Sequence, residues 1–174
     1  MAGALIKLDE EIVTSAVASV TIGDTAWDSS YDVYMVTINK LAPSTDGAGL
    51  QFRTTSSGVP NTTATYDRAF LRMKTDTAFQ PRGGSNETYF NFATSVGTAT
   101  SETLNAVFYL FNFNNSSEYS HLTVEANNIT SGGVLTGNQG GHILTLYTAC
   151  DGLQFFMSSG NIASGKFTLY GLAK

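Results

Sequence analysis

The sequence predicts an all-β fold, a jelly-roll-like antiparallel β-sandwich of about eight to ten strands. Apolar and polar residues alternate in many short runs, which is the period of two of a β-strand. Clusters of Gly, Pro, Asn, Asp and Ser interrupt these runs roughly every 8–12 residues, a spacing typical of sandwiches and barrels. The crossover helices that a parallel α/β fold needs are missing, which excludes that class.

The stretch 153–172 shows this alternation most clearly. In its first run Leu153, Phe155 and Met157 share one face, and its second run alternates in the same way. The loop between the runs contains Ser-Gly-Asn, which suits a tight reversal because Gly and Asn tolerate positive φ. We therefore expect a closing hairpin, with Ile162 in its loop plugging the open end of the core.

The other elements follow from the same pattern. Two segments rich in turn residues, 75–87 and 127–141, are expected to be irregular because Gly, Pro and Asn favour turns. Strands are expected over 18–22, 31–41, 50–55, 66–74, 88–95 and 104–113, around Leu122, Val124 and Ala126, and over 142–150.

Domain organisation is simple. We divide the chain into an N-terminal arm or edge strand, residues 1–15, and a single β-sandwich domain, residues 16–174. Residues 10–16 are compatible with one helical turn, although their β-branched members weaken it. At 174 residues the chain is long enough to bury a core of its own.

The composition argues against partners, such as nucleic acid, that bind to a strongly charged protein surface. Charged residues are 13% of the chain and hydrophobic residues 42%, so Ser, Thr, Asn and Gly must cover much of the surface. The formal net charge of −5 argues against nucleic acid, because phosphate binding needs a basic face. No run approaches the roughly 20 apolar residues that span a bilayer, and no secretory signal is visible. We therefore expect no membrane partner and synthesis in a cytoplasm.

The reactive residue types form no catalytic or metal-binding motif. Cys150 is the only cysteine and lies in an apolar run, which is typical of a small buried residue. His121 and His142 are far apart in the sequence, and no Gly-x-Ser-x-Gly turn frames a nucleophile. Paired carboxylates could come only from the acidic run 9–11 or from scattered loops, and we interpret that run as solvated charge. We expect no cofactor, no metal and no enzymatic activity.

Three aromatic residues near one turn, Trp27, Tyr31 and Tyr34, have two interpretations. Tyr and Trp in loops at the end of a sandwich can stack on a sugar ring, which would make a carbohydrate platform. In the second interpretation the same residues make core or subunit contacts, and this is the favoured one.

The run 104–113 bears on assembly because it is apolar on both faces. Phe108 shares one face with Ala106 and Leu110, while Tyr109, Phe111 and Phe113 lie on the other with Val107. A sandwich covers only one face of each strand, so the second apolar face needs a flap of the chain or a neighbouring subunit. Phe108, Tyr109, Phe111 and Phe113 are therefore candidate oligomer contacts.

Motifs in a fixed order lie near both ends of the chain. They are Ser-Tyr-Asp-Val-Tyr at 30–34, Pro-Ser-Thr-Asp-Gly-Ala-Gly-Leu-Gln-Phe at 43–52, Gln-Phe-Phe-Met-Ser-Ser-Gly-Asn-Ile at 154–162, then Gly165 and Leu-Tyr-Gly at 169–171. Together they resemble jelly-roll virion structural proteins of tailed bacteriophages, many from marine bacteria and cyanobacteria. The middle of the chain, about 61–141, lacks the acidic tracts of many members, and Lys166 stands where a small polar residue is expected.

The resemblance implies a protein on the virion surface, made in the cytoplasm of a host bacterium. The first hypothesis is a non-enzymatic capsid decoration, or cement, protein that clamps neighbouring subunits, with the major capsid protein or a tail protein as partner. Phage surface proteins suggest a homotrimer by analogy. The alternative hypothesis is a receptor-binding module of a tail fibre or appendage that grips host surface carbohydrate.

Overall fold

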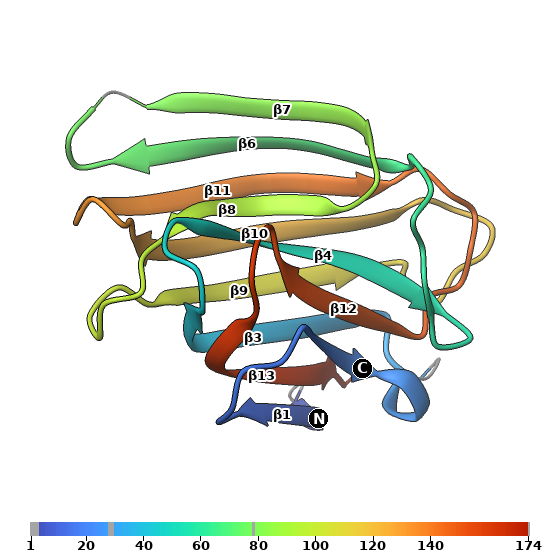
Figure 1. The fold of residues 1–174 in the computed structure, drawn as a ribbon. Helices are drawn as coiled ribbons and strands as arrows, with labels where there is room; N and C mark the ends of the chain where they lie inside the picture. Colours follow the sequence, from blue (N-terminus) through green and yellow to red (C-terminus); the bar gives the residue numbers. More distant parts are fainter. Residues whose placement is uncertain (1–3, 28–29, 78, 174) are drawn as a thin grey trace.

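Two antiparallel β-sheets face each other across the core of the protein (Figure 1). The computed structural model describes residues 4–27, 30–77 and 79–173. Within these residues the only helical element is a short 3₁₀ turn, η1 (Asp24–Ala26), and the rest is strand, turn and loop. The predicted all-β, jelly-roll-like sandwich is confirmed.

The large sheet has eight strands and the small sheet has five. In spatial order the large sheet contains β1 (Leu5–Val13), β13 (Ile162–Leu172), β3 (Val33–Pro43), β9 (Leu104–Phe111), β10 (Ser120–Ile129), β11 (Leu135–Leu144), β6 (Tyr66–Lys74) and β7 (Gln80–Glu87). The small sheet contains β2 (Ser19–Gly23), β12 (Gly152–Met157), β4 (Ala48–Ser56) and β5 (Val59–Pro60), and β8 (Phe90–Val96) pairs with β4.

Phenylalanine rings fill the space between the sheets. Phe52 of β4 has its ring centroid 5.0 Å from that of Phe90, 5.4 Å from Phe108 and 5.3 Å from Phe155. Phe92 lies 6.0 Å away in an edge-on arrangement, and all five side chains are at most 1% exposed. Because they come from both sheets, these rings join β4, β8 and β12 to β9, and such aromatic pairs add to the free energy of burying their area.

More strands are present than the sequence predicts, because glycine-rich segments pair instead of looping. Residues 75–87 and 127–141, expected to be irregular, contribute β7, the end of β10 and most of β11. In β11, a Cβ placed on Gly140 would lie 2.4 Å from Cα of Phe70 on β6. Glycine there marks a close approach of two backbones within the sheet, which composition alone cannot distinguish from a loop.

The expected closing hairpin is wrong. β12 pairs with β2 and β4 in the small sheet, whereas β13 pairs with β1 and β3 in the large sheet. The connection crosses between the sheets, held where Ser158 N donates to Gly49 O at 2.8 Å and Asn161 N donates to Ser44 Oγ at 2.8 Å. Ile162 is fully buried, but as the first residue of β13.

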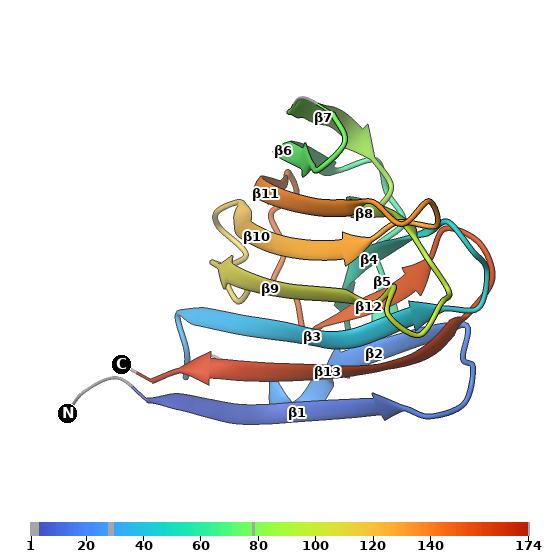
Figure 2. The ribbon, with the colours of Figure 1, turned by 90° about the vertical axis from the view of Figure 1, so that its left-hand side faces the viewer.

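The predicted N-terminal arm or edge strand contains one strand, β1 (Leu5–Val13), and no helical turn. β1 runs antiparallel to β13, from the pair Leu5 and Leu172 to the pair Val13 and Gly165, and forms one edge of the large sheet (Figure 2). The helical turn considered for residues 10–16 is therefore wrong, because pairing along a strand overrides a weak local propensity. The strand expected over 142–150 ends at Leu144.

Replacing Phe108 by Ala should destabilise the fold by about 3–5 kcal/mol, because it removes a fully buried ring from the centre of the aromatic core. Phe79→Ala is the control, since that side chain is 66% exposed and should change the stability by less than about 0.5 kcal/mol. Chemical denaturation of both variants measures the difference. Similar losses in the two variants would contradict this account of the core.

Candidate functional site

Trp27, Tyr31 and Tyr34, for which a carbohydrate platform and core or subunit contacts are the two interpretations, come together mainly inside the fold. The rings of Trp27 and Tyr34 stack with centroids 4.3 Å apart, and Phe113 lies 5.9 Å from Trp27. Trp27 is 7% exposed and Tyr34 is 1% exposed, so a sugar or a neighbouring subunit cannot cover their faces. Tyr31 is partly buried, its ring lies edge-to-face with that of Tyr34, and it lines a small surface hollow with Asn114. The cluster closes one end of the core.

The four candidate oligomer contacts divide into two pairs. Phe108 and Phe113 are each 1% exposed and belong to the core, so they do not face a neighbour. Tyr109 is 45% exposed and Phe111 is 37% exposed, and both point away from the small sheet. Alternation along β9 explains why Phe108 points into the core while Tyr109 and Phe111 point outwards. Phe113 follows the end of the strand, where the chain turns back and brings its ring into the core.

The exposed pair lies at the centre of a broad surface, which we call the outer face: the side of the large sheet that points away from the small sheet. Register pairing places Tyr109 between Met35 of β3 and Thr123 of β10, and Phe111 between Val33 and His121. Apolar members of the central outer face are Val33, Met35, Val107, Tyr109, Phe111 and Ile143, and polar members are Thr37, Asn105, Thr123, Glu125, Asn127 and Gln139.

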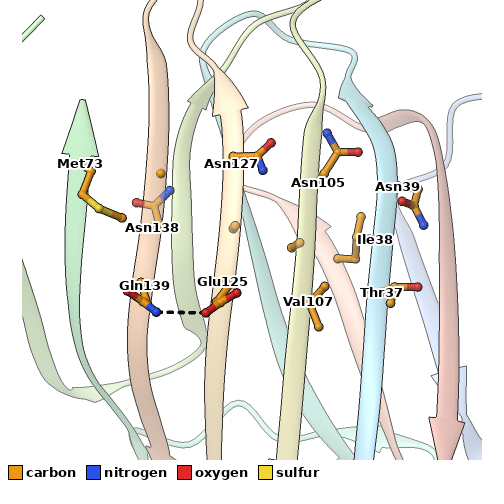
Figure 3. Close-up of a pocket in the computed structure, with 13 residues that line it drawn as sticks. Thr37, Ile38, Asn39, Met73, Asn105, Val107, Glu125, Asn127, Asn138 and Gln139 are labelled. Atoms are coloured by element: carbon orange, nitrogen blue, oxygen red, sulfur yellow. Dashed lines mark hydrogen bonds between the residues drawn. The ribbon is translucent and has the colours of Figure 1, made fainter. Parts of the chain in front are cut away.

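A shallow hollow of about 530 Å³ occupies one end of the outer face (Figure 3). Asn39, Asn105 and Asn127 line it with amide groups that come from three neighbouring strands. Gln139 Nε2 donates a hydrogen bond to Glu125 Oε1 at 3.0 Å. Glu125 is the one charged side chain that lines the hollow. The hollow therefore offers hydrogen-bond donors and acceptors beside apolar side chains, without a strong local charge.

The two histidines lie on opposite faces of neighbouring strands. His121 of β10 is exposed on the outer face, whereas His142 of β11 is 4% exposed and points into the sandwich. The ring of His142 stacks on Phe70 at 5.8 Å and meets the edge of Phe90 at 5.3 Å. Burial lowers the pKa of His142 to about 4. Among the described residues no three His, Cys, Asp or Glu side chains are grouped as a metal site would require.

Cys150 and the acidic run 9–11 have surroundings that point to a role in the fold. Burial raises the pKa of the Cys150 thiol to about 12. Glu10 Oε2 lies 2.8 Å from Lys166 Nζ, and a hydrogen bond from Lys166 lowers the pKa of Glu10 and raises that of Lys166. Asp9 accepts a hydrogen bond from Gly23 N at 2.9 Å, which ties β1 to the end of β2. Asp9 and Glu10 therefore have partners within the fold, whereas Glu11 is exposed as the solvated-charge interpretation predicts.

Sequence reasoning missed a group of arginines on β6 and β7. Arg68 and Arg72 occupy alternate positions of β6, and Arg82 lies opposite Phe70 on β7, so all three belong to the side of the large sheet that faces β8. The period of two in the segment 66–74 was the available signal, since it places Arg68, Phe70 and Arg72 on one face.

Comparisons with known proteins add little to this geometry. No protein-family model and no curated protein matches the chain. Over 98% of its length the chain is similar to 34% of a fructofuranosidase from Schwanniomyces occidentalis complexed with fructosylnystose, with a TM-score of 0.29 and 6% identity. It is also similar over 98% of its length to 41% of the VP2 chain of an infectious bursal disease virus subviral particle, with a TM-score of 0.12 and 12% identity. The chain thus spans well under half of either protein.

In the part of the chain that the structure covers, no helix combines the length and the apolar character needed to cross a bilayer.

The pKa of His142 predicts how stability depends on pH. Its ordinary value of 6.5 falls to about 4 in the fold, so between these values the unfolded chain binds a proton that the folded protein does not. Stability should therefore fall by about 3 kcal/mol as the pH drops through this window. Unfolding free energies of the wild type and His142→Gln, measured from pH 7 to pH 4, should show a smaller loss in the variant. Equal losses would contradict the prediction.

Proposed function

We propose that this chain is a non-enzymatic structural protein of a bacteriophage particle surface, most simply a capsid decoration or cement protein. It would act by contacts with neighbouring subunits, with the major capsid protein or a tail protein as its further partner on the virion. The resemblance of the motifs at both ends of the chain to phage virion proteins supports a place on the virion surface. The single observation that carries the mode of action is the exposure of Tyr109 and Phe111 at the centre of the outer face.

The edges of the large sheet are poor sites for assembly. β1 carries Lys7, Asp9 and two glutamates, and its pairing with β13 contains a bulge. β7 carries Pro81, which cannot donate to a further strand, and its pairing with β6 is also irregular. Charges, proline and bulges are the usual means by which an edge strand avoids pairing with another chain. Contact through the outer face is therefore the better-supported mode.

The chemistry of the outer face suits a second copy of the same chain. Asn105, Asn127 and Gln139 carry amide groups that both donate and accept hydrogen bonds, so a like surface complements them. Charged side chains are few here: Glu125 lies among these residues and Asp67 lies beside Phe111 and Ile143, so charge repulsion between two copies is limited. A stable contact buries roughly 800 Å² per partner, which is about a tenth of the 7991 Å² of accessible surface. These properties support the proposed homo-oligomer, for which the phage analogy suggests a trimer.

The alternative is a receptor-binding module of a tail fibre or appendage that grips host surface carbohydrate. The amide-lined hollow of the outer face favours it, because sugar hydroxyl groups pair with such donors and acceptors. Copy number separates the two hypotheses: a decoration protein is present in many copies on each particle, and a tail module in few.

The oligomer proposal predicts that Tyr109→Glu and Phe111→Glu dissociate the assembly, because each buries an unpaired charge in an apolar contact. Light scattering after size-exclusion chromatography at micromolar concentration should give an oligomer for the wild type and a monomer for both variants. Circular dichroism should show that the variants keep their strands.

Val59→Glu is the matched control. Val59 is 66% exposed on β5 of the small sheet, away from the outer face, and its replacement should leave the assembly intact. A wild-type protein that stays monomeric would contradict the proposal, as would dissociation of the Val59 variant to the same extent.

A decoration protein should also bind empty phage capsids in many copies and raise the temperature at which they open. Calorimetry of capsids with and without added protein measures this shift, and Phe111→Glu provides the comparison. Binding of wild-type protein without any shift would count against a cementing role.

A further inference from the structure

The large sheet extends beyond the small sheet at the end formed by β6 and β7. In Figure 1 these two strands lie above β8, the last strand of the small sheet on that side. Buried and partly covered residues accordingly alternate along the inner face of β6. Tyr66 and Phe70 are buried, while Arg68 and Arg72 are only partly covered. Arginine is tolerated at positions 68 and 72 because its guanidinium group reaches solvent beyond the end of the core.

A cleft of about 240 Å³ opens between this overhang and β8. Its lining consists of Arg68, Phe70, Arg72, Arg82, Asn91 and Thr94. Arg68 donates from Nη1 to Asn91 O at 3.3 Å, and Arg72 donates from Nη2 to the hydroxyl of Thr94. These bonds hold two guanidinium groups against β8 and leave further N–H groups of each for a ligand, since guanidinium has five donors.

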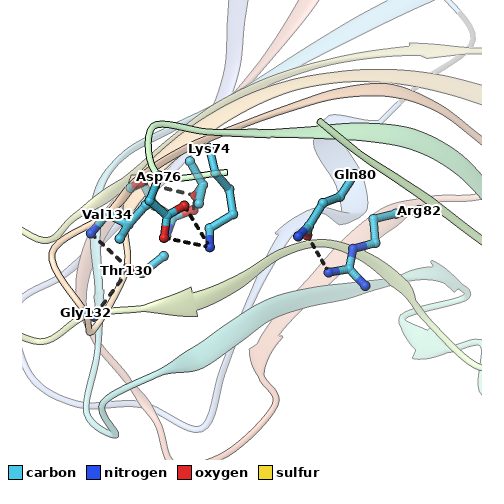
Figure 4. A network of polar contacts seen from close by, with 9 residues as sticks. Lys74, Asp76, Gln80, Arg82, Thr130, Gly132 and Val134 are labelled. Carbon is cyan, nitrogen blue, oxygen red and sulfur yellow. Dashed lines mark hydrogen bonds and ion pairs between the residues drawn. The ribbon is translucent and has the colours of Figure 1, made fainter. Parts of the chain in front are cut away.

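The cleft carries more positive charge than its neighbours neutralise. Arg68 pairs with Glu87 at 2.8 Å, and Lys74, further along β6, pairs with Asp76 at 3.1 Å. Arg82, by contrast, bonds the neutral side chain of Gln80 at 2.9 Å (Figure 4). No carboxylate among the described residues forms a salt bridge with Arg72 or Arg82. Three guanidinium groups and one carboxylate leave two positive charges.

The environment of Arg72 reflects this excess. Burial, with Arg82 and Arg68 nearby, lowers the pKa of Arg72. An anion in the cleft would remove the repulsion among these three groups, and hydrogen bonds to charged groups are the stronger ones.

Buried polar atoms at the cleft also lack protein partners. Arg68 Nε and Asn91 Oδ1 have none among the described residues. Buried groups of this kind are normally hydrogen-bonded. One of these two atoms is a donor and the other an acceptor, so a simple anion would satisfy only the donor.

We propose that this cleft binds an acidic sugar unit of a polysaccharide, with its carboxylate or sulfate on the guanidinium groups of Arg72 and Arg82 and its hydroxyl groups on Asn91 and Thr94. The acceptor Asn91 Oδ1 needs a donor, which sugar hydroxyls supply and an acidic peptide side chain lacks. The net charge of −5 does not forbid this, because salt screens charges beyond about 10 Å.

The proposal concerns the inner side of the large sheet and does not depend on assembly through the outer face. Its test measures binding of polygalacturonate and dextran sulfate, with neutral dextran and polyglutamate as comparisons. The wild type should bind one or both acidic polysaccharides more tightly than polyglutamate, and should not bind dextran. Arg72→Gln and Arg82→Gln should each weaken binding about ten-fold, the loss expected for a charge-assisted hydrogen bond.

Arg53→Gln is the matched control for charge. Arg53 lies outside the cleft, with its guanidinium 4.6 Å from the ring centroid of Phe156 and a hydrogen bond to Thr88 O. Its replacement should leave the affinity unchanged. The proposal is overturned if no polyanion binds, if polyglutamate binds as tightly as the polysaccharides, or if all three arginine variants lose affinity equally. Thermal unfolding and the oligomer mass of the same variants show whether folding or assembly has changed instead.

Discussion

The packing of aromatic rings between the two sheets is the constraint on which the rest of the structure depends. Phe52 contacts rings from its own sheet and from β9 of the opposite sheet, and none of these rings reaches solvent. The core therefore fixes the distance and the register of the sheets. It also fixes which side chains of β9 point outwards, because a shift by one residue would exchange the two faces.

Both candidate surfaces are consequences of that core. Alternation along β9 puts Phe108 among the rings and leaves Tyr109 and Phe111 outside, where only another molecule can cover them. The eight-stranded sheet is wider than its partner, so the inner face of β6 and β7 extends past the rings and accommodates arginine. One sandwich thus presents a nearly neutral face on one side and a basic cleft on the other.

The sequence predicted the features that depend on strong alternation and failed where local composition was ambiguous. The period of two around Phe155 and Phe108 identifies the class of fold and the residues that share a face of each strand. The glycines of β11 predict a loop, because nothing local shows that Gly140 approaches Phe70 of another strand. The crossing between β12 and β13 was missed for a similar reason, since a turn sequence does not tell whether the next strand joins the same sheet.

The candidate sites were predictable to a lesser degree. Tyr109 and Phe111 were identified because their strand is apolar on both faces. The sequence predicts Trp27 in a turn and Tyr34 in the strand that follows, as core or subunit contacts, and only the fold shows that their stacked rings close the core. The arginine cleft joins Arg68 and Arg72 to Asn91, which lies on a strand of the opposite sheet, and no spacing in the sequence indicates that contact.

Hydroxyl-radical footprinting of the assembled protein tests the central claim most directly, because it reads the solvent exposure of individual aromatic rings. The account predicts that Tyr109 and Phe111 are protected in the assembly and labelled in the monomer, while Phe79 is labelled equally in both. Equal labelling of Tyr109 and Phe111 in the assembly and the monomer would contradict it.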